Sequence, residues 1–274
     1  MSKTIVITGA GGVLCSGFAE FLADQGHRIA LLDLNGAAAE AVAEKIRARG
    51  GKAQAYACSV LDRGELEAVR EAVKKDLGPC DILINGAGGN NPRATTAHEE
   101  FEKGDEDTAD LLTFFNIDEK GFDFVFDLNI KGVLLPSQAF LKDMLGREGC
   151  CVLNISSMNA YRPLTKIPAY SAAKAAVSNF TQWLAVHFAK EGIRVNAIAP
   201  GFFVTNQNRD LLFTKEGAPT ARTEKILRAT PMNRFGKPEE LWGAVEWLLD
   251  EKKAGFVTGV TVPIDGGFSA YSGV

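Results

Sequence analysis

A tyrosine and a lysine four residues apart are the residues of this chain best suited to acid–base chemistry. Tyr170 and Lys174 lie in an alanine-rich stretch, and their spacing places both side chains on one face of a helix. A nearby ammonium favours a phenolate, so Lys174 would lower the pKa of Tyr170 from about 10 toward working pH. Ser157 stands 13 residues before Tyr170, at the end of an apolar stretch typical of a strand. Together these side chains predict proton transfer to or from a substrate oxygen.

A glycine-rich turn near the N-terminus predicts a phosphate-binding site. The run TGAGGVLCSG, residues 8–17, follows an apolar strand and opens a helix. Glycines let the backbone approach a pyrophosphate, and a helix N-terminus offers unpaired N–H groups. Asp33 ends the next expected strand, where a carboxylate accepts hydrogen bonds from a ribose diol and repels a 2′-phosphate. Because no Arg or Lys lies between Gly9 and Gly17 or directly after Asp33, the pattern favours NAD over NADP.

Short apolar runs alternate with helical patterns along the whole chain. The expected strands cover residues 4–8, 28–33, 52–57, 81–85, 150–156, 194–199 and 256–264. The expected helices cover residues 16–25, 37–49, 62–75, 122–145, 168–190 and 238–250. This alternation predicts an α/β doubly wound Rossmann fold, with about seven parallel strands, helices on both faces, and one domain over residues 1–274.

Two segments are too long to be ordinary connections between a strand and a helix. Residues 88–120 and 201–235 both follow the carboxyl ends of expected strands, where ligands of open α/β sheets bind. Both are therefore candidate walls of a substrate site. Residues 97–123 carry ten acids and two bases, a local charge of −8, which predicts a solvated surface.

Composition excludes several classes of protein. The 274 residues are 46% hydrophobic and 23% charged, as in ordinary globular proteins. The net charge of −4 disfavours nucleic-acid binding, and no apolar run approaches the length of a membrane span. Five cysteines without zinc-site or disulfide spacing are expected to be reduced and mostly buried, with no metal bound. With no leader pattern at the N-terminus, the expected location is the cytoplasm.

These motifs together resemble the short-chain dehydrogenase/reductase family over essentially the whole chain. The matching residues are Thr8, Gly9, Asn85, Gly86, Ala87, Gly88, Asn129, Ser157, Tyr170, Lys174, Pro200, Gly201, Asp265, Gly266 and Gly267. The resemblance implies that Tyr170 exchanges the hydroxyl proton and that Lys174 also binds the nicotinamide ribose. It implies that Ser157 hydrogen-bonds the reacting oxygen and that Asn129 holds a water that relays protons past Lys174.

The resemblance also implies the residues that contact NAD. They are Gly9, Gly11, Gly12, Val13, Leu14, Asp33, Ser59, Val60, Asn85, Ala87, Gly88, Tyr170, Lys174, Pro200, Gly201, Phe203 and Thr205. Thr205 would fix the carboxamide. The chain departs from the family pattern in its first turn, where Val13 and Cys15 stand in place of glycines, and after the third strand, where Ser59–Val60 replaces Asp-Val.

Three segments resemble one branch of the family more closely, that of D-mannonate oxidoreductase (fructuronate reductase). They are residues 85–92, 156–170 and 267–274. This resemblance implies NADH-dependent reduction of D-fructuronate to D-mannonate, a small sugar acid.

A sugar acid requires a cation for its carboxylate. Arg93 follows the fourth expected strand and Arg162 lies between Ser157 and Tyr170, so either arginine could pair with that group. Asn159 and Asn206 are the candidates for reading its hydroxyls. We expect residues 88–120 to cover the site with their acids facing solvent.

Other functions remain open from the sequence. One is reduction of another ketone within the same family, as in a gluconate 5-dehydrogenase or a 3-oxoacyl reductase. Another is a catalytically silent nucleotide-binding regulator, which the presence of Ser157, Tyr170 and Lys174 disfavours. The family resemblance, and a helix at 168–190 that is apolar on more than one side, lead us to expect a homotetramer.

Overall fold

Seven parallel strands form the centre of the computed structural model, which describes residues 2–204, 209–215 and 217–273. The strands are β1 (Thr4–Thr8), β2 (Arg28–Asp33), β3 (Lys52–Ala57), β4 (Ile82–Asn85), β5 (Cys151–Ile155), β6 (Arg194–Pro200) and β7 (Thr261–Ile264). Their order in the sheet is β3-β2-β1-β4-β5-β6-β7, so successive strands are added outward on one side of β1 up to β3 and on the other side from β4 onward, which makes the boundary between β1 and β4 the switch point of the sheet. The predicted doubly wound fold is confirmed, and the carboxyl ends of β1 and β4 are where such a sheet binds ligands.

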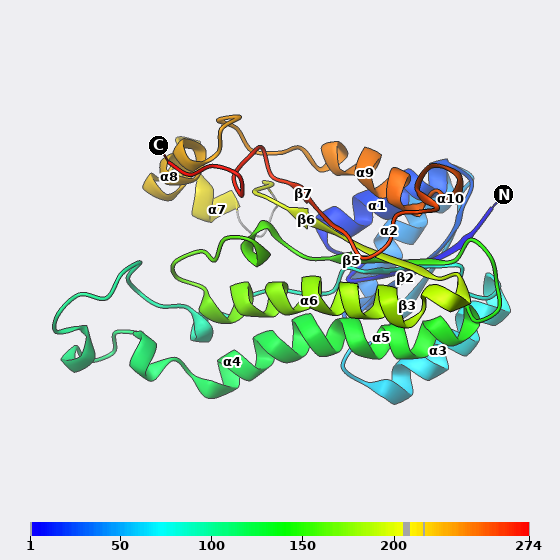
Figure 1. The fold of residues 1–274 in the computed structure, drawn as a ribbon, viewed down its shortest axis with the longest axis horizontal. Coiled ribbons are helices and arrows are strands. Elements are labelled where there is room, and N and C mark those ends of the chain that lie inside the picture. Colours follow the sequence, from blue (N-terminus) through cyan, green and yellow to red (C-terminus); the bar gives the residue numbers. More distant parts are fainter. Residues whose placement is uncertain (1, 205–208, 216, 274) are drawn as a thin grey trace.

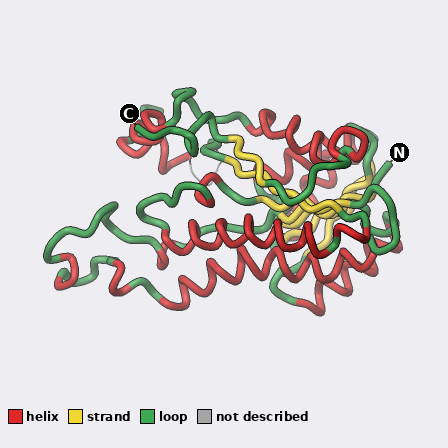
Figure 2. Tube along the Cα trace, in the orientation of Figure 1, coloured by secondary structure: helices red, strands yellow, loops and turns green. Residues whose placement is uncertain are grey.

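Helices cover both faces of this sheet (Figures 1 and 2). In chain order they are α1 (Val13–Asp24), α2 (Gly36–Ala48), α3 (Arg63–Asp76), α4 (Glu119–Phe126), α5 (Gly132–Phe140), α6 (Pro168–His187), α7 (Arg209–Leu212), α8 (Ala221–Ala229), α9 (Trp242–Leu249) and α10 (Glu251–Ala254). Alternate residues of β1 enter two separate cores. Ile5 and Ile7 pack against α1, α2 and α9, whereas Val6 packs against α3, α5 and α6.

The prediction of a long helix within residues 122–145 is wrong in one respect. A π-helical turn at Asp127–Lys131 separates α4 from α5. The Asn129 side chain lies in this turn and donates from Nδ2 to the Val125 carbonyl at 2.7 Å. The side-chain amide thus binds a carbonyl oxygen of the preceding helical turn. Such π turns are frequent at functional sites.

The last strand is also shorter than the expected 256–264, because β7 begins only at Thr261. Gly259 lies in the left-handed region, with φ of +77°, and its N–H donates to the Val195 carbonyl. The chain therefore turns onto the sheet at this glycine rather than running along it from residue 256.

Residues 89–118, which we call the arm, extend away from the sheet beside α4 (Figure 1). They form three short 3-10 turns and no strand or longer helix. His98 Nδ1 lies 3.1 Å from both carboxylate oxygens of Asp105, which anchors one bend of the arm. Of the ten acids in residues 97–123, all except Asp105 and Asp118 are exposed, as expected for a solvated surface.

The remaining structural expectations concern thiols and membrane spans. All five cysteines are free and buried, and burial raises the pKa of the Cys15 thiol to about 12. In the described part of the chain, no helix has both the length and the apolarity needed to span a bilayer.

Candidate active site

The end of β5 and the start of α6 bring the predicted acid–base residues together. Ser157 follows β5 and begins a short 3-10 turn, while Tyr170 occupies the first turn of α6 and Lys174 the second. The Ser156 hydroxyl donates to the Lys174 carbonyl at 3.1 Å and lies 2.8 Å from the Ser178 hydroxyl, which ties the strand end to the helix. Ser157 is 8% exposed and Lys174 only 4%, so water is largely excluded from both.

Burial controls the electrostatics of this cluster. It lowers the pKa of Lys174 to about 8, because a buried ammonium loses its hydration. Lys174 Nζ donates to the Ile155 carbonyl at 2.9 Å and lies 5.6 Å from the centroid of the Tyr170 ring. Burial raises the pKa of Tyr170, and a hydrogen bond from the Ser157 hydroxyl only partly opposes this.

The expected lowering of the Tyr170 pKa is therefore not seen in the protein without ligands. Because burial raises the pKa of Tyr170 above that of an ordinary phenol, the hydroxyl keeps its proton. In that form its hydroxyl can donate a proton to a ketone oxygen. The Ser157 hydroxyl, which hydrogen-bonds Tyr170, is placed to contact the same oxygen.

Asn129 and Gly88 complete the cluster from the other side. Asn129 is fully buried, donates from Nδ2 to the Gly89 carbonyl at 2.8 Å, and accepts from the Gly89 N–H at 3.3 Å. A Cβ atom at Gly88 would lie 2.7 Å from Asn129 Oδ1 and 3.0 Å from Lys174 Nζ. These three residues therefore meet at one point, and only glycine leaves room there.

The glycine-rich turn forms a cradle beside β1. Gly9 has a φ of +65°, and a Cβ there would lie 2.9 Å from the backbone of Ala87. A Cβ at Gly11 would lie 2.7 Å from Ala38 Cβ. Gly12 is the N-cap of α1 without a side-chain cap, so the N–H groups of the first turn are available to an anion.

Asp33 stands at the end of β2 next to this cradle. Its Oδ2 accepts from the Gly11 N–H at 2.9 Å, and its Oδ1 accepts from the Asn35 N–H at 2.8 Å. Each carboxylate oxygen retains a lone pair, so both can accept from a ribose hydroxyl as well. The glycine cradle, the uncapped helix and this carboxylate fit a dinucleotide without a 2′-phosphate.

The packing of Cys15 accounts for one of the two departures from the glycine pattern of the family in this turn. A Cβ at Gly86 would lie 2.1 Å from Cys15 Sγ, so the thiol fills space that Gly86 leaves open. The Thr8 hydroxyl accepts from the N–H groups of Gly86 and Ala87 at 3.1 and 3.2 Å, which holds the turn after β4. This role of Thr8 could not be predicted from local sequence, because its partners are nearly 80 residues away.

The other predicted cofactor residues lie along the same edge of the sheet. Val13 and Leu14 begin α1. The Ser59 N–H donates to Glu65 Oε2 at 2.7 Å, and Val60 is buried. The Asn85 amide donates to Ser137 and Asn154 inside the sheet, so it supports the site from beneath.

Two glycine motifs meet where β6 and β7 end. A Cβ at Gly201, after Pro200, would lie 2.6 Å from Asp265 Cα. Phe203 is buried with its ring against Gly236. Thr205 and Asn206 lie outside the described residues.

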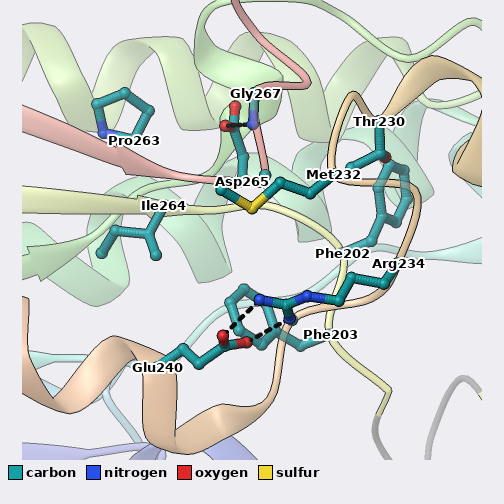
Figure 3. A pocket seen from close by; sticks show the side chains of 12 residues that line it. Phe202, Phe203, Thr230, Met232, Arg234, Glu240, Pro263, Ile264, Asp265 and Gly267 are labelled. Carbon is teal, nitrogen blue, oxygen red and sulfur yellow. Dashed lines mark hydrogen bonds and ion pairs between the residues drawn. The ribbon is translucent and has the colours of Figure 1, made fainter.

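A cavity of about 340 Å³ lies beside Phe203, between the segment around Arg234 and the end of β7 (Figure 3). Arg234 forms a bidentate ion pair with Glu240, with distances of 2.6 and 2.7 Å, and this pair lowers the pKa of Glu240 to about 2. The Asp265 carboxylate accepts from the N–H groups of Gly267 and Ser269. The charged groups of this cavity are thus paired with one another or with the backbone.

The predicted substrate residues are only partly close to the catalytic cluster. Arg93 is ion-paired with Asp118 at 2.8 Å and its side chain is 59% exposed, so it supplies no free cation. Arg162 is exposed on the loop after Ser157. Asn159 is buried, its N–H donates to the Ser157 hydroxyl at 3.3 Å, and its Oδ1 has no partner among the described residues. Asn159 is therefore the one of the three that adjoins the catalytic cluster.

Comparison with known proteins places this geometry in a family. A family model described as short chain dehydrogenase matches residues 3–215. A Haemophilus influenzae crystal structure, described as a candidate D-mannonate oxidoreductase with bound NAD, is 60% identical with a TM-score of 0.95 and covers 99% of this chain and 96% of its own.

Two curated bacterial proteins also match almost the whole chain. The uncharacterized oxidoreductase UxuB of Bacillus subtilis is 53% identical, over 99% of this chain and 96% of its own length. The 5-keto-D-gluconate 5-reductase of Escherichia coli is 32% identical, over 97% of this chain and 94% of its own length. The chain therefore belongs to the short-chain dehydrogenase family of oxidoreductases.

Proposed function

We propose that the protein uses NADH to reduce D-fructuronate to D-mannonate, and NAD for the reverse reaction. The observation that carries the proposal is the hydrogen-bonded pair of Ser157 and Tyr170 beside the buried Lys174, at the carboxyl edge of a sheet with a dinucleotide cradle. The name of the Haemophilus influenzae relative, and the NAD bound in its structure, support the choice of substrate and cofactor.

The cofactor would supply a hydride to the ketone carbon. The side chains of the protein would supply the proton, orient the ketone and stabilise the charge that develops. The Tyr170 hydroxyl gives its proton to the ketone oxygen, which becomes the new hydroxyl group. Ser157 donates a hydrogen bond to the same oxygen and orients it. The ammonium of Lys174 stabilises the phenolate left on Tyr170 until a proton returns from solvent.

A panel of ketones, assayed by NADH oxidation, tests this proposal. The panel contains D-fructuronate, 5-ketogluconate and an acetoacetyl thioester. We expect the highest kcat/KM with D-fructuronate. A higher value with 5-ketogluconate would favour the function named for the Escherichia coli relative, and turnover of any of the three would exclude a silent regulator.

We expect NADH to be preferred over NADPH by about 100-fold or more in kcat/KM, because Asp33 would face the 2′-phosphate at close range. Replacing Asp33 with Asn should reduce that preference at least tenfold. The asparagine side chain keeps an oxygen to accept from the Gly11 N–H but carries no charge, so the cradle should persist. Steady-state kinetics with both cofactors measure the ratio, and comparable efficiency in the wild type would contradict the assignment.

We also propose a homotetramer located in the cytoplasm. The free, buried cysteines suit a reducing compartment. A cavity of about 600 Å³ lies between α5 and α6, lined by apolar residues such as Phe180 and Leu145, and Trp183 and Val186 on α6 are exposed. A second subunit would cover this apolar face.

Light scattering at micromolar concentration should therefore give the mass of four chains. Replacing Val186 with Glu should lower that mass, because a charge would be buried at the contact. A monomeric wild type would overturn the proposed assembly.

A further inference from the structure

A basic cavity lies between α8 and the loop that leads into α6. It has a volume of about 280 Å³ and is lined by Lys166, Arg222 and Lys225 together with apolar residues. We propose that this cavity binds the carboxylate of the substrate and that Arg222 is the residue that selects for an acid. This inference rests on the proposed function and replaces Arg93 and Arg162 as the carboxylate partner.

The charges of the cavity do not balance. Three cations face one carboxylate, that of Glu99, which leaves a charge of about +2 when all four groups are ionised. Glu99 pairs with Lys225 at 2.9 Å, and Lys166 Nζ donates to the Ala97 carbonyl at 2.5 Å. In the part of the chain that the structure describes, no carboxylate lies within 4 Å of the Arg222 guanidinium. Lys166 and Arg222 thus both lack an ion-pair partner among the described residues, but Lys166 already donates to a backbone carbonyl, so Arg222 is the cation of the three whose donors are open to an anionic ligand.

The apolar lining makes this cation more effective. Ile167, Phe202 and Ile226 line the same cavity and displace water from one side of the charged groups. An ion pair is stronger where the surroundings are less polar. An arginine fork also matches the two oxygens of a carboxylate better than an ammonium does.

The cavity adjoins the reacting residues through two elements. Ile167 is the N-cap of α6, and Tyr170 follows within the first turn of that helix. Residues three apart on a helix are neighbours, with Cβ atoms about 5–6 Å apart. Phe202 directly follows Gly201 at the end of β6, and α8 lies on the side of the molecule where α6 begins (Figure 1). A hexuronate with its ketone at Tyr170 can therefore extend its carboxylate, several carbons away, into the cavity.

The arm completes the cavity without blocking it. Ala97 and Glu99 belong to the arm, and their contacts with Lys166 and Lys225 attach it to the loop before α6 and to α8. The remaining acids of the arm are mostly exposed, where solvent and salt screen them. The charge of −8 over residues 97–123 therefore does not prevent an anionic substrate from reaching Arg222.

Replacing Arg222 with Met in the full-length protein tests the inference. We expect the KM for D-fructuronate to rise about tenfold, the lower end for a charge-assisted pair, because the guanidinium is partly solvated. The kcat should stay within about twofold, since Tyr170 and Ser157 are untouched. The KM for NADH, and the rate with D-fructose as a neutral ketose, should not change.

Arg228 provides a matched control. It lies on the same helix, is exposed, and does not line the cavity. Arg228→Met should therefore keep wild-type kinetics, and Arg222→Lys should show a smaller rise in KM than Arg222→Met. Circular dichroism and the thermal midpoint should be the same for all variants, because Arg222 and Arg228 are both exposed and neither belongs to the hydrophobic core.

The outcomes separate this inference from the proposed function. An unchanged KM for every acid in Arg222→Met, or an equal rise for acids and D-fructose, would overturn the role of Arg222 and leave the proposed function standing. If the wild type reduces 5-ketogluconate but not D-fructuronate, and Arg222→Met raises the KM for 5-ketogluconate, the substrate assignment fails and the carboxylate site stands. If no acid is reduced, both fail.

Discussion

Replacing Tyr170 with Phe is expected to lower kcat for ketone reduction by about 10²–10⁴-fold, the usual contribution of a positioned acid. The ring would still fill its place, but no hydroxyl would remain to give a proton to the ketone oxygen. The hydrogen bond from Ser157 to Tyr170 would be lost at the same time. The Kd for NADH should stay within about twofold, because the cradle at Gly9 and Gly11 and the carboxylate of Asp33 are unaltered.

Steady-state kinetics and a fluorescence titration with NADH measure the two effects separately. Tyr161→Phe is the matched control, since Tyr161 lies close by in sequence and its hydroxyl donates to the Thr261 carbonyl, away from Ser157. That variant should keep most of the wild-type rate. A Tyr170→Phe protein that retained a tenth of the activity would show that the proton comes from another group.

Replacing Lys174 with Met is expected to reduce kcat by about 10²–10³-fold, comparable with removal of one donor that stabilises a transition-state anion. Met occupies a similar volume but cannot stabilise the phenolate of Tyr170. The Kd for NADH should rise about tenfold or more, because the family resemblance implies a charged hydrogen bond from Lys174 to the nicotinamide ribose. This joint loss distinguishes Lys174→Met from Tyr170→Phe, which should impair catalysis alone.

Although Lys174→Met should lose catalytic activity and affinity for NADH, the folded protein should not lose stability at neutral pH. Burial lowers the pKa of Lys174 from 10.5 to about 8, so the unfolded chain binds a proton more readily than the folded one. A destabilisation of about 3 kcal/mol is present in the wild type below pH 8 and disappears as the pH rises to 10.5. Replacing Lys174 with Met removes this destabilisation but also removes the hydrogen bond to the Ile155 carbonyl, which lowers the free energy of unfolding by about 1 kcal/mol.

Lys174→Met should therefore be at least as stable as the wild type at pH 7, and the difference should move in favour of the wild type between pH 8 and 10.5. Thermal midpoints of both proteins at equal concentration across this range check the sign. A midpoint that falls sharply at pH 7 in the variant would mean that Lys174 holds the fold together, and its kinetic defect would then say little about chemistry.

Most of the fold could be predicted because the local signals agree with the final structure. Strands buried on both faces, such as β1, β4 and β5, are rich in apolar residues along their whole length. All seven strands were recognised, with β7 too long in the prediction. The π turn at Asp127–Lys131 could not be predicted, because the apolar pattern of a helix continues through it. The turn coincides with Asn129 binding both Gly89 and Val125, and Gly89 lies 40 residues earlier.

The chemistry of this protein could be read from the amino-acid sequence wherever that chemistry depends on close spacing. Tyr170 and Lys174 share one helix face, Gly9 to Gly12 form one turn, and Asp33 ends one strand; each follows from local geometry. The identity of the family followed from the same motifs.

The pKa of the catalytic tyrosine and the choice of arginine for the substrate carboxylate depend on tertiary packing. Whether a group is charged depends on burial, and burial raises the pKa of Tyr170 where local reasoning about Lys174 expected the reverse. Which arginine is free depends on distant carboxylates: Asp118 neutralises Arg93, whereas Arg222 has no such partner among the described residues and lines a cavity beside α6. No spacing along the chain carries that information, because Arg93 meets Asp118 only when the start of the arm packs against its end at the N-terminus of α4, and Arg222 lines the cavity only when α8 packs beside the loop before α6.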